Sequence, residues 1–277
     1  YARRECVEHY ACCPTRELHR GHMLSTSIVV IDFETTGLSP YSGDRVTEVA
    51  ALRLHGSGVV DRFVTLANAG VAIPRHIVNI TGITDEMIAA APPVSWVVRT
   101  LVEFIGTDTI AAHNASFDHR FLVSECVRAG IGYQDFESLC TMRLSRRLLP
   151  GLASYRLQSV AAHLGVRYPG RAHRAEADAI VTANILVQLA NEVAARHSIA
   201  AVDPALLRRL TRWSVREAHS KLARALAPRS ADEGCGETRQ EGANPSLATP
   251  TARWRLYPAG NLCDMRNDVL YRRSQIR

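Results

Sequence analysis

The chain has 277 residues, of which 47% are hydrophobic, 22% charged and 6% aromatic. This composition is ordinary for a folded globular protein, and it excludes a fully disordered chain and a fibrous repeat. No run of 18 apolar residues occurs, so the sequence predicts no transmembrane helix and we expect no association with a membrane.

Basic charge is concentrated in the C-terminal third. Residues 28–195 carry 14 basic and 16 acidic side chains, whereas residues 196–277 carry 15 and 8. A basic tail is typical of contact with nucleic acid, a membrane surface or an acidic partner. A solvated, partly disordered tail would show the same charge pattern, so charge alone leaves both interpretations open.

The seven cysteines are odd in number and irregularly spaced, which argues against a disulfide framework. Cys126 and Cys140 lie in apolar surroundings and are expected in the core. The cysteines and histidines of residues 1–22 match no common zinc-ligand spacing, so we favour an unstructured leader there. Without a secretory signal in residues 1–27, we expect a cytoplasmic protein.

Regular patterning begins just after Met23, and we hypothesise that Met23 is the natural start. Short β-branched runs then predict strands over Ile28–Phe33, Val46–Leu54, Val59–Leu66, Thr109–His113 and Phe136–Cys140. Apolar periodicity and end signals predict helices over Val94–Ile105, Ser116–Ala129, Thr141–Leu148, Ser154–Leu164 and Ala175–Ala195. Three strands followed by alternating helices and strands predict an α/β fold with a mixed sheet.

The C-terminal region has a different pattern. Pro204–Ala227 is an amphipathic helix candidate, and Arg229–Ala252 lacks large apolar residues apart from one Leu, as a disordered linker does. Trp254–Leu270 regains some apolar content. The predicted organisation is a disordered leader at 1–26, a domain at 27–195, a helical extension at 196–227, and a flexible linker with a C-terminal patch at 228–277.

Two carboxylates mark the end of the first predicted strand. Asp32 and Glu34 are two residues apart, so on a strand they point to the same face. They follow an apolar run and precede a tight turn at Thr35-Thr36-Gly37. Because two buried carboxylates repel each other, a hard divalent cation with oxygen ligands is the expected remedy.

Two further acidic residues and a histidine occur at element ends. Asp118 follows a predicted strand and lies in the first turn of a helix, where it would also favour the helix N-terminus electrostatically. Asp178 lies early in the last long helix, and His173 precedes it by five positions. Taken singly, each has an ordinary structural explanation, and only their combination points to a site.

In chain order, the motifs Asp32-Phe-Glu34-Thr-Thr-Gly37, His113-Asn-Ala-Ser-Phe-Asp118 and His173-x4-Asp178 resemble those of the DnaQ-like DEDDh 3′-5′ exonucleases. The resemblance covers about residues 27–192, and supporting segments are Ile80-Thr-Gly-Ile-Thr84, Cys140-Thr-Met-Arg143 and Tyr155-Arg-Leu157. Arg174 stands where the DEDDy branch carries tyrosine. The family implies a ribonuclease H-like mixed sheet flanked by helices.

The resemblance also implies a two-metal hydrolysis of phosphodiester bonds at 3′ ends. By resemblance, Asp32, Glu34, Asp118 and Asp178 hold two Mg²⁺ or Mn²⁺ ions, and His173 takes the proton from the attacking water. An imidazole titrates near neutral pH, which suits that task.

The same resemblance assigns substrate contacts. The backbone of Thr35, Thr36 and Gly37 is expected near the terminal nucleotide, and Leu38 and Phe117 near unstacked bases. Asn114 is expected to contact the substrate backbone. Ordinary core packing would equally explain Phe117. The arginines of the helix after Cys140, which are Arg143, Arg146 and Arg147, are candidates for the strand path, although a basic surface helix would look the same.

Within the family, the resemblance is strongest to the epsilon proofreading subunits of bacterial DNA polymerase III, which have the exonuclease domain first and a flexible tail that binds the polymerase. We therefore expect single-stranded DNA 3′ ends as substrate and a polymerase subunit as a partner of the tail. An RNA-trimming exoribonuclease of the ribonuclease T or oligoribonuclease type is the main alternative. A nuclease fold kept only as an interaction scaffold is less favoured, because all five chemical residues are present.

Overall fold

The computed structural model describes residues 23–132 and 135–226. The predicted leader up to residue 22, the predicted linker and the predicted C-terminal patch lie outside the described residues. The first strand begins at Met23, a few residues before the predicted domain boundary. Within the described ranges, no helix is long and apolar enough to cross a membrane.

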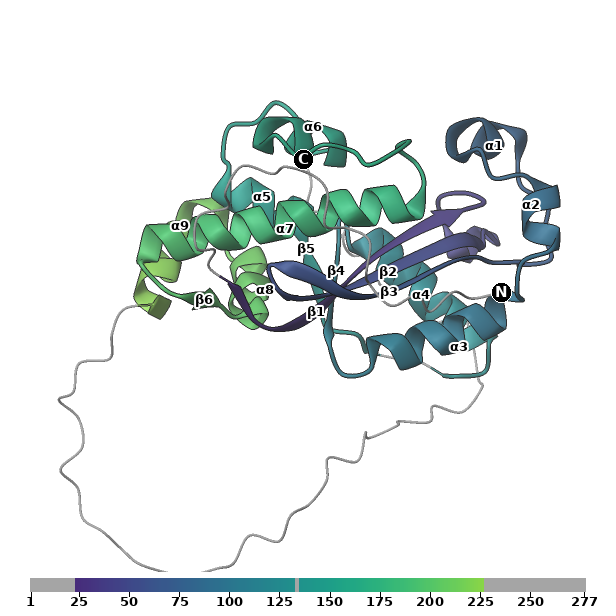
Figure 1. The fold of residues 1–277 in the computed structure, drawn as a ribbon, viewed down its shortest axis with the longest axis horizontal. Coiled ribbons are helices and arrows are strands. Elements are labelled where there is room, and N and C mark those ends of the chain that lie inside the picture. The colour runs from purple at the N-terminus through teal and green to yellow at the C-terminus, as the bar shows by residue number, and fades with distance from the viewer. Residues whose placement is uncertain (1–22, 133–134, 227–277) are drawn as a thin grey trace, which may run out of the picture. The chain divides into compact units, whose positions relative to one another are not determined.

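A mixed β-sheet forms the centre of the fold (Figure 1). Its main strands lie in the order β3-β2-β1-β4-β5, and β6 pairs with the start of β1. The pairs β1–β2 and β2–β3 are antiparallel, whereas β1–β4 and β4–β5 are parallel. The strands are β1 (Met23–Thr35), β2 (Val46–Gly56), β3 (Gly58–Leu66), β4 (Thr109–Ala112), β5 (Ser138–Cys140) and β6 (Ala201–Val202). The predicted α/β mixed sheet is confirmed.

Helices pack on both faces of this sheet. The helices are α1 (Arg75–Thr81), α2 (Asp85–Ala89), α3 (Val94–Ile105), α4 (Ser116–Arg128), α5 (Thr141–Leu148), α6 (Leu157–Leu164), α7 (Ala175–His197), α8 (Pro204–Arg212) and α9 (Val215–Leu226), with a 3₁₀ turn η1 (Pro40–Ser42). One core cluster contains residues of α3 and α4, and the other contains residues of α5 to α9. Figure 1 shows α7 and α3 on opposite sides of the sheet.

Strand β1 contributes side chains to both core clusters because it is buried on its two faces. Ile28 and Val30 belong to the cluster under α7, whereas Val29 and Ile31 belong to the cluster under α3 and α4. Successive side chains of a strand alternate between faces. Asp32 therefore continues the face of Ile28 and Val30, toward α7, just where the apolar run ends.

Helix α7 lies close to the sheet because it presents small side chains to it. Ala175, Ala179 and Ala183 recur every four residues, which places them on one face, and all three are buried. The helix contacts both β1 and β2 along their lengths. Small residues let the backbones approach closely, and this brings the first turn of α7 over the end of β1.

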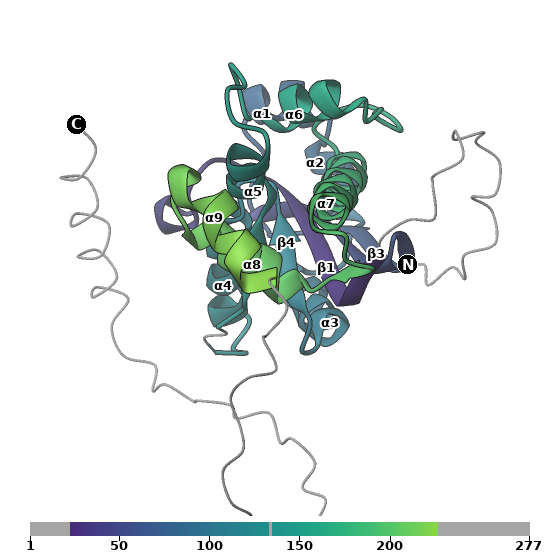
Figure 2. The same cartoon turned by 90° about the vertical axis from the view of Figure 1, so that its left-hand side faces the viewer.

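The C-terminal helices α8 and α9 join the same core cluster. Leu207, Leu210 and Leu222 are at most 1% exposed within it. Where the sequence predicts one helix over Pro204–Ala227, the structure has two. The break falls at Ser214, whose hydroxyl oxygen accepts a hydrogen bond from the Glu217 N–H at 3.3 Å and so begins α9 as an N-cap. Figure 2 shows both helices beside α5.

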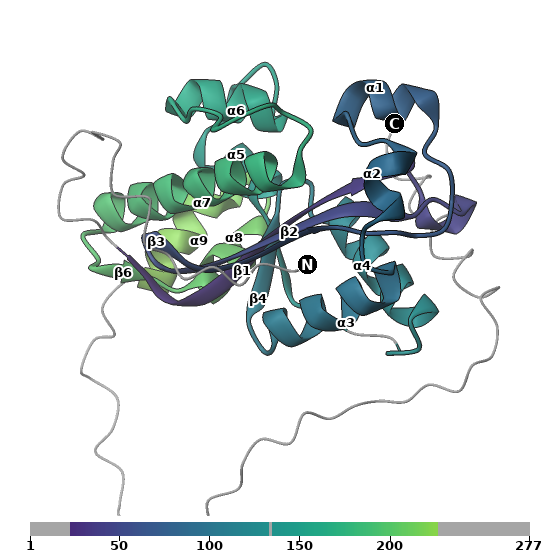
Figure 3. The same cartoon turned by 45° about the vertical axis from the view of Figure 1, so that its right-hand side comes forward.

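Three smaller features complete the described fold. Cys126 and Cys140 are free and buried, so their prediction as core residues is confirmed. Helices α1 and α2, which the sequence patterns did not predict, lie together beyond the end of β3 (Figure 3). They enclose a small separate core of Ile73, Ile83 and Ile88.

Candidate active site

The carboxylates of β1 lie at the edge of the sheet where β1 and its parallel neighbour β4 both end. Asp32 pairs with Ala50 and Glu34 with Glu48 in the antiparallel register to β2. Both side chains are partly buried. Sites in α/β proteins commonly form at the carboxyl ends of parallel strands, because loops and helix starts converge there.

Asp118 reaches this edge from the first turn of α4. Its side chain is 3% exposed, and its Oδ1 accepts a hydrogen bond from the backbone N–H of Phe33 at 3.2 Å. Phe33 lies between Asp32 and Glu34, so this bond ties α4 to the strand segment that carries both carboxylates. Asp118, which comes from the second motif, is therefore a neighbour of the two carboxylates of the first motif.

Asp178 and His173 come from the other side, from the start of α7 and the loop before it. The Asp178 Oδ2 accepts a hydrogen bond from the His173 N–H at 3.1 Å. His173 has φ = 63°, a left-handed conformation that costs a residue with a β-carbon about 1–2 kcal/mol. Its side chain is exposed, whereas Asp178 is only 8% exposed.

The side chains of Glu34, His173 and Asp178 meet closely. One ligand atom from each lies within 4.8 Å of the others, a separation suited to a shared metal ion. The Oδ1 atom of Asp178 is buried and makes no well-aligned hydrogen bond within the described residues, although the Tyr168 hydroxyl lies nearby. A buried carboxylate oxygen without a well-aligned partner is costly. Oxygen donors of this kind suit a hard divalent cation, so the residues present fit the predicted metal site.

Electrostatics reinforce this assignment. Burial raises the pKa of Asp32 well above its usual range, and the charges of Asp118, Asp178 and Glu34 raise it further. Burial, with the charges of Asp178 and Glu48, raises the pKa of Glu34 to about 8. Burial likewise raises the pKa of Asp118 to about 8. The cluster therefore holds more negative charge than its own surroundings compensate, and cations would reverse that balance.

A fifth carboxylate, not singled out from the sequence, borders the cluster. Glu48 on β2 is 3% exposed and pairs with Arg174, whose Nη2 lies 2.6 Å from its Oε1. The sequence signal was a lone Glu inside the apolar run Val46–Leu54. That signal becomes informative only once the register places Glu48 opposite Glu34.

The turn after β1 is built by its own hydrogen bonds. The Thr35 hydroxyl donates to the Gly37 carbonyl at 2.6 Å, and Thr36 Oγ1 accepts from the Arg45 N–H at 2.9 Å. A β-carbon at Gly37 would lie 2.4 Å from an oxygen of Asp44, so a larger residue would force the Asp44 carboxylate away from its hydrogen bond with the Ser39 N–H. Beside this compact turn, Leu38 is 79% exposed. The predicted substrate contacts of these residues stay predictions.

The loop between β4 and α4 presents the remaining motif residues. Asn114 is exposed and has φ = 66°, one of three described non-glycine residues with positive φ, another being His173. Phe117 is half-buried, with its ring 4.9 Å from that of Phe121. His113 is structural: its Nε2–H donates to the Tyr155 carbonyl at 2.9 Å.

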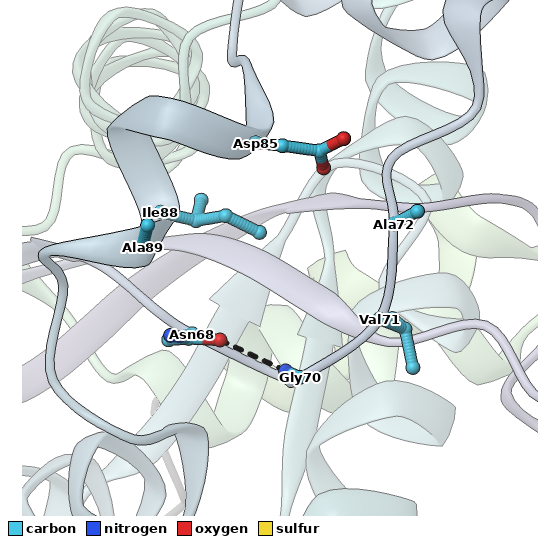
Figure 4. Close-up of a pocket in the computed structure, with 7 residues that line it drawn as sticks. All are labelled: Asn68, Gly70, Val71, Ala72, Asp85, Ile88 and Ala89. Carbon is cyan, nitrogen blue, oxygen red and sulfur yellow. Dashed lines mark hydrogen bonds between the residues drawn. The ribbon is translucent and has the colours of Figure 1, made fainter.

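A hollow lies elsewhere on the molecule. It is lined by Asn68, Gly70, Val71, Ala72, Asp85, Ile88 and Ala89, at the loop after β3 and at α2 (Figure 4). Two of its polar groups are already engaged, since Asp85 accepts from the Ile73 N–H and Asn68 from the Gly70 N–H. None of the predicted site residues lines it.

Comparison with known proteins decides the family. Residues 29–186 match the family model described as "Exonuclease". The chain belongs to this exonuclease family. The match covers β1 to most of α7, and so includes all five residues of the predicted chemical site. The predicted family and fold are thereby confirmed, whereas the roles of individual site residues stay predictions.

The relatives include bacterial DNA polymerase III proteins and a bacterial 3′-5′ exonuclease. The chain is 33% identical over 181 residues to a DNA polymerase III subunit epsilon of Aquifex aeolicus, covering 65% of this chain and 88% of that one. It is 36% identical over 177 residues to a DNA polymerase III of PolC type from Bacillus cereus, covering 64% and 12%. It is 35% identical over 161 residues to the 3′-5′ exonuclease DinG of Bacillus subtilis, covering 58% and 17%. The chain thus spans only a small part of the PolC and DinG relatives.

Solved structures agree on the fold. Exonuclease X, solved with 5′-overhanging duplex DNA, is 29% identical with a TM-score of 0.50, over 59% of this chain and 91% of that one. Escherichia coli exonuclease I, solved with a dT13 oligonucleotide, has a TM-score of 0.54 at 20% identity, over 62% and 42%. The second likeness concerns the fold alone.

Proposed function

We propose that this protein is a metal-dependent 3′-5′ exonuclease that removes nucleotides from 3′ ends of single-stranded DNA. The observation that carries the proposal is the meeting of Glu34, His173 and Asp178 within 4.8 Å, inside the segment that matches the exonuclease family. The partly buried Asp32 and the buried Asp118 lie at the same edge of the sheet. The epsilon, PolC and DinG relatives favour DNA over RNA as the substrate.

The four carboxylates of the site are the proposed metal ligands. Asp32, Glu34, Asp118 and Asp178 would bind two Mg²⁺ or Mn²⁺ ions, because their raised pKa values indicate uncompensated negative charge. Bound there, divalent cations would lower the pKa of a water and neutralise the phosphodiester.

His173 is the proposed general base. Its ring is exposed to solvent, yet one of its nitrogens lies near the Glu34 and Asp178 carboxylates, so it is placed to take a proton from a water held there. The hydrogen bond from its own N–H to Asp178 fixes the backbone from which the ring projects.

Substrate contacts are proposed for the loops around the carboxylates. Leu38 is exposed beside the turn that follows β1, and is available to an unstacked terminal base. Phe117 offers a half-buried ring, while the Thr35, Thr36 and Gly37 backbone and the exposed Asn114 side chain would hold the terminal nucleotide.

The single strand is proposed to leave the site along α5. Arg146 stacks on Tyr155, with its guanidinium carbon 5.5 Å from the ring centre, and the Tyr155 carbonyl binds His113 beside the site. Arg143 is exposed on the same helix, while Arg147 donates to the Trp213 carbonyl. Arginines interleaved with aromatic rings suit a nucleic-acid backbone with stacked bases.

The test is hydrolysis of 5′-labelled single-stranded DNA and RNA of one sequence, with Mg²⁺, with Mn²⁺ and with a chelator. We expect stepwise shortening of the DNA from its 3′ end, abolished by the chelator, and slower shortening of the RNA. Faster cleavage of the RNA would favour the RNA-trimming alternative. No cleavage of either strand with either metal would contradict the proposed activity.

We also propose a polymerase subunit as a partner. The epsilon relative, of which this chain covers 88%, supports a polymerase partner, and the tail after Ala227 is the proposed contact. Capture of the replicative polymerase from the source cells by the full chain, but not by a chain ending at Ala227, is the expected result. Equal capture by both would contradict the role of the tail.

A further inference from the structure

The pair Glu48–Arg174 lies beside the proposed base and has more contacts than an ordinary ion pair. Arg174 donates to Glu48 through Nη2 at 2.6 Å and through Nε at 3.1 Å. The N–H of Ala175, the first residue of α7, donates to Glu48 Oε2 at 2.9 Å. Because both oxygens of Glu48 are engaged, this carboxylate is not placed as a further metal ligand.

Hydrogen bonds hold the backbone of His173 on both sides, and we call these two sets of bonds its anchors. On one side its own N–H is bonded to Asp178, and on the other the next two residues, Arg174 and Ala175, are bonded to Glu48. His173 needs these anchors because its φ of 63° is a conformation that surrounding contacts must maintain. Figure 1 shows α7, whose start carries these residues, lying along the sheet that contains Glu48.

We propose that Glu48 and Arg174 are positioning residues that hold His173 in the geometry its proton transfer requires; this inference rests on the proposed function. Arg174 presents a planar fork that binds a carboxylate in two places, so the pair fixes orientation as well as distance. The Arg174 charge offsets part of the repulsion that Glu48 adds to the neighbouring carboxylates, since it lowers the pKa of Glu34 where Glu48 raises it.

The test uses two charge-removing variants, Glu48→Gln and Arg174→Gln, and their double variant. Arg196→Ala is the matched control, because Arg196 pairs with Glu192 on the exposed far end of the same helix. The substrate is the p-nitrophenyl ester of thymidine 5′-monophosphate with saturating Mn²⁺. We expect each single variant to lower kcat about 10–100-fold with KM nearly unchanged, as loss of a supporting contact does.

Coupling between the two residues is the second readout. The double variant should lose no more activity than either single variant, because both act through one contact. It also keeps the local net charge, so the acid midpoint of its pH–rate profile should match that of the unaltered protein. Multiplicative losses, or a shifted midpoint, would overturn the inference.

The decisive arm places Glu48→Gln in a His173→Ala protein. If the Glu48–Arg174 pair acts through His173, adding Glu48→Gln to the His173→Ala protein should not lower the residual rate further. A further loss of the same size would show that the pair acts through Asp178 or the metals, and would overturn the inference. Single variants Glu48→Gln or Arg174→Gln that are as active as the Arg196→Ala control would also overturn the inference.

Hydrogen exchange of the His173 N–H decides the question independently of activity. We expect at least about tenfold faster exchange in Glu48→Gln than in Arg196→Ala, since the anchored backbone opens more often. Unchanged exchange would overturn the positioning role. An unaltered protein that cleaves no nucleic acid would contradict the proposed function instead, and the exchange result would still stand.

Discussion

Two groups of buried carboxylates in this protein differ in what surrounds them. Glu125 on α4 is 1% exposed, and Arg45 binds both its oxygens, at 2.8 and 2.9 Å. Arg128 and the Val46 N–H add further donors. Asp118 is similarly buried at 3% exposed and Asp32 is partly buried, but within the described residues neither forms an ion pair with an arginine or lysine.

The difference teaches that burial alone does not mark a functional carboxylate. Glu125 is compensated by the fold itself, so its role is to join α4 to the start of β2. The cluster of Asp32, Glu34, Asp118 and Asp178 has no such compensation from the described residues, so it is fully ionised only at the cost of repulsion, which protons or bound cations would relieve. Glu48 is intermediate, since it is adjacent to the cluster but compensated by Arg174.

The largest expected effect comes from removing one uncompensated carboxylate. Asp32→Ala should reduce hydrolysis with Mg²⁺ to below a few per cent, because the metal site loses a ligand. Thermal stability without metal should hold or rise, because repulsion within the cluster falls. Activity assays paired with thermal melts in a chelator check both statements. Substantial remaining activity, or a large loss of metal-free stability, would count against the site.

Removing the proposed base should have the next largest effect. His173→Ala should lower turnover by about 10²–10⁴, the usual contribution of a general base. Metal affinity should change little, because the four carboxylates remain. Single-turnover kinetics and a Mn²⁺ titration measure the two properties separately. Lost metal binding with nearly normal turnover at high metal concentration would show that His173 is a ligand rather than the base.

The compensated carboxylate should respond in the opposite way. Arg45→Ala leaves the buried Glu125 with only the longer contacts to Arg128 and the Val46 N–H, and should lower the free energy of unfolding by about 3 kcal/mol. The double variant Arg45→Met with Glu125→Leu should recover most of that loss, since apolar replacements of a buried pair are often neutral. Urea denaturation measures both. A stable Arg45→Ala protein would mean that Glu125 is less enclosed than its 1% exposure indicates.

A smaller effect is expected from the pH dependence of metal-free stability. The pKa of Glu34 is about 8 in the folded state and near its ordinary 4.5 when unfolded, so the folded state binds the proton more tightly. Stability should therefore fall as pH rises from 4.5 through 8.

Glu34→Gln isolates this contribution. It should make no difference to stability below pH 4.5 and should stabilise the metal-free protein by roughly 2 kcal/mol above pH 8. This is less than the roughly 5 kcal/mol that the full pKa shift would give an isolated group, because Glu34 is only partly buried and solvent screens its charge. Urea denaturation in a chelator at the two ends of this range is the measurement. An equal effect of the substitution at both ends would contradict the raised pKa of Glu34.

Much of the fold followed from local patterns. The limits of α3 and α5 agree with prediction because both have strong apolar periodicity or clear end signals. Helices α1 and α2 were missed because they have only seven and five residues, too few for a periodic signal. The split between α8 and α9 depends on a single capping residue, Ser214, inside a continuous amphipathic pattern.

The residues of the site likewise fall into those that local motifs predict and those that only the folded structure reveals. The motifs predicted Asp32, Glu34, Asp118, His173 and Asp178, since each stands at the end of a predictable element. Glu48 and Arg174 could not be recognised, because their meaning depends on strand register and on how α7 approaches β2. The spacing of residues in a single sequence does not reveal contacts between segments that are far apart along the chain.

The central claim, that the uncompensated carboxylates bind divalent metal, is tested most directly by calorimetric titration of the full chain with Mn²⁺ at pH 8. Asp32→Asn is the site variant, and Glu125→Gln is the control in the compensated group. The account predicts two bound ions per chain in the unaltered protein and in Glu125→Gln, and loss of binding in Asp32→Asn. No binding to the unaltered protein, or equal binding to all three, would contradict it.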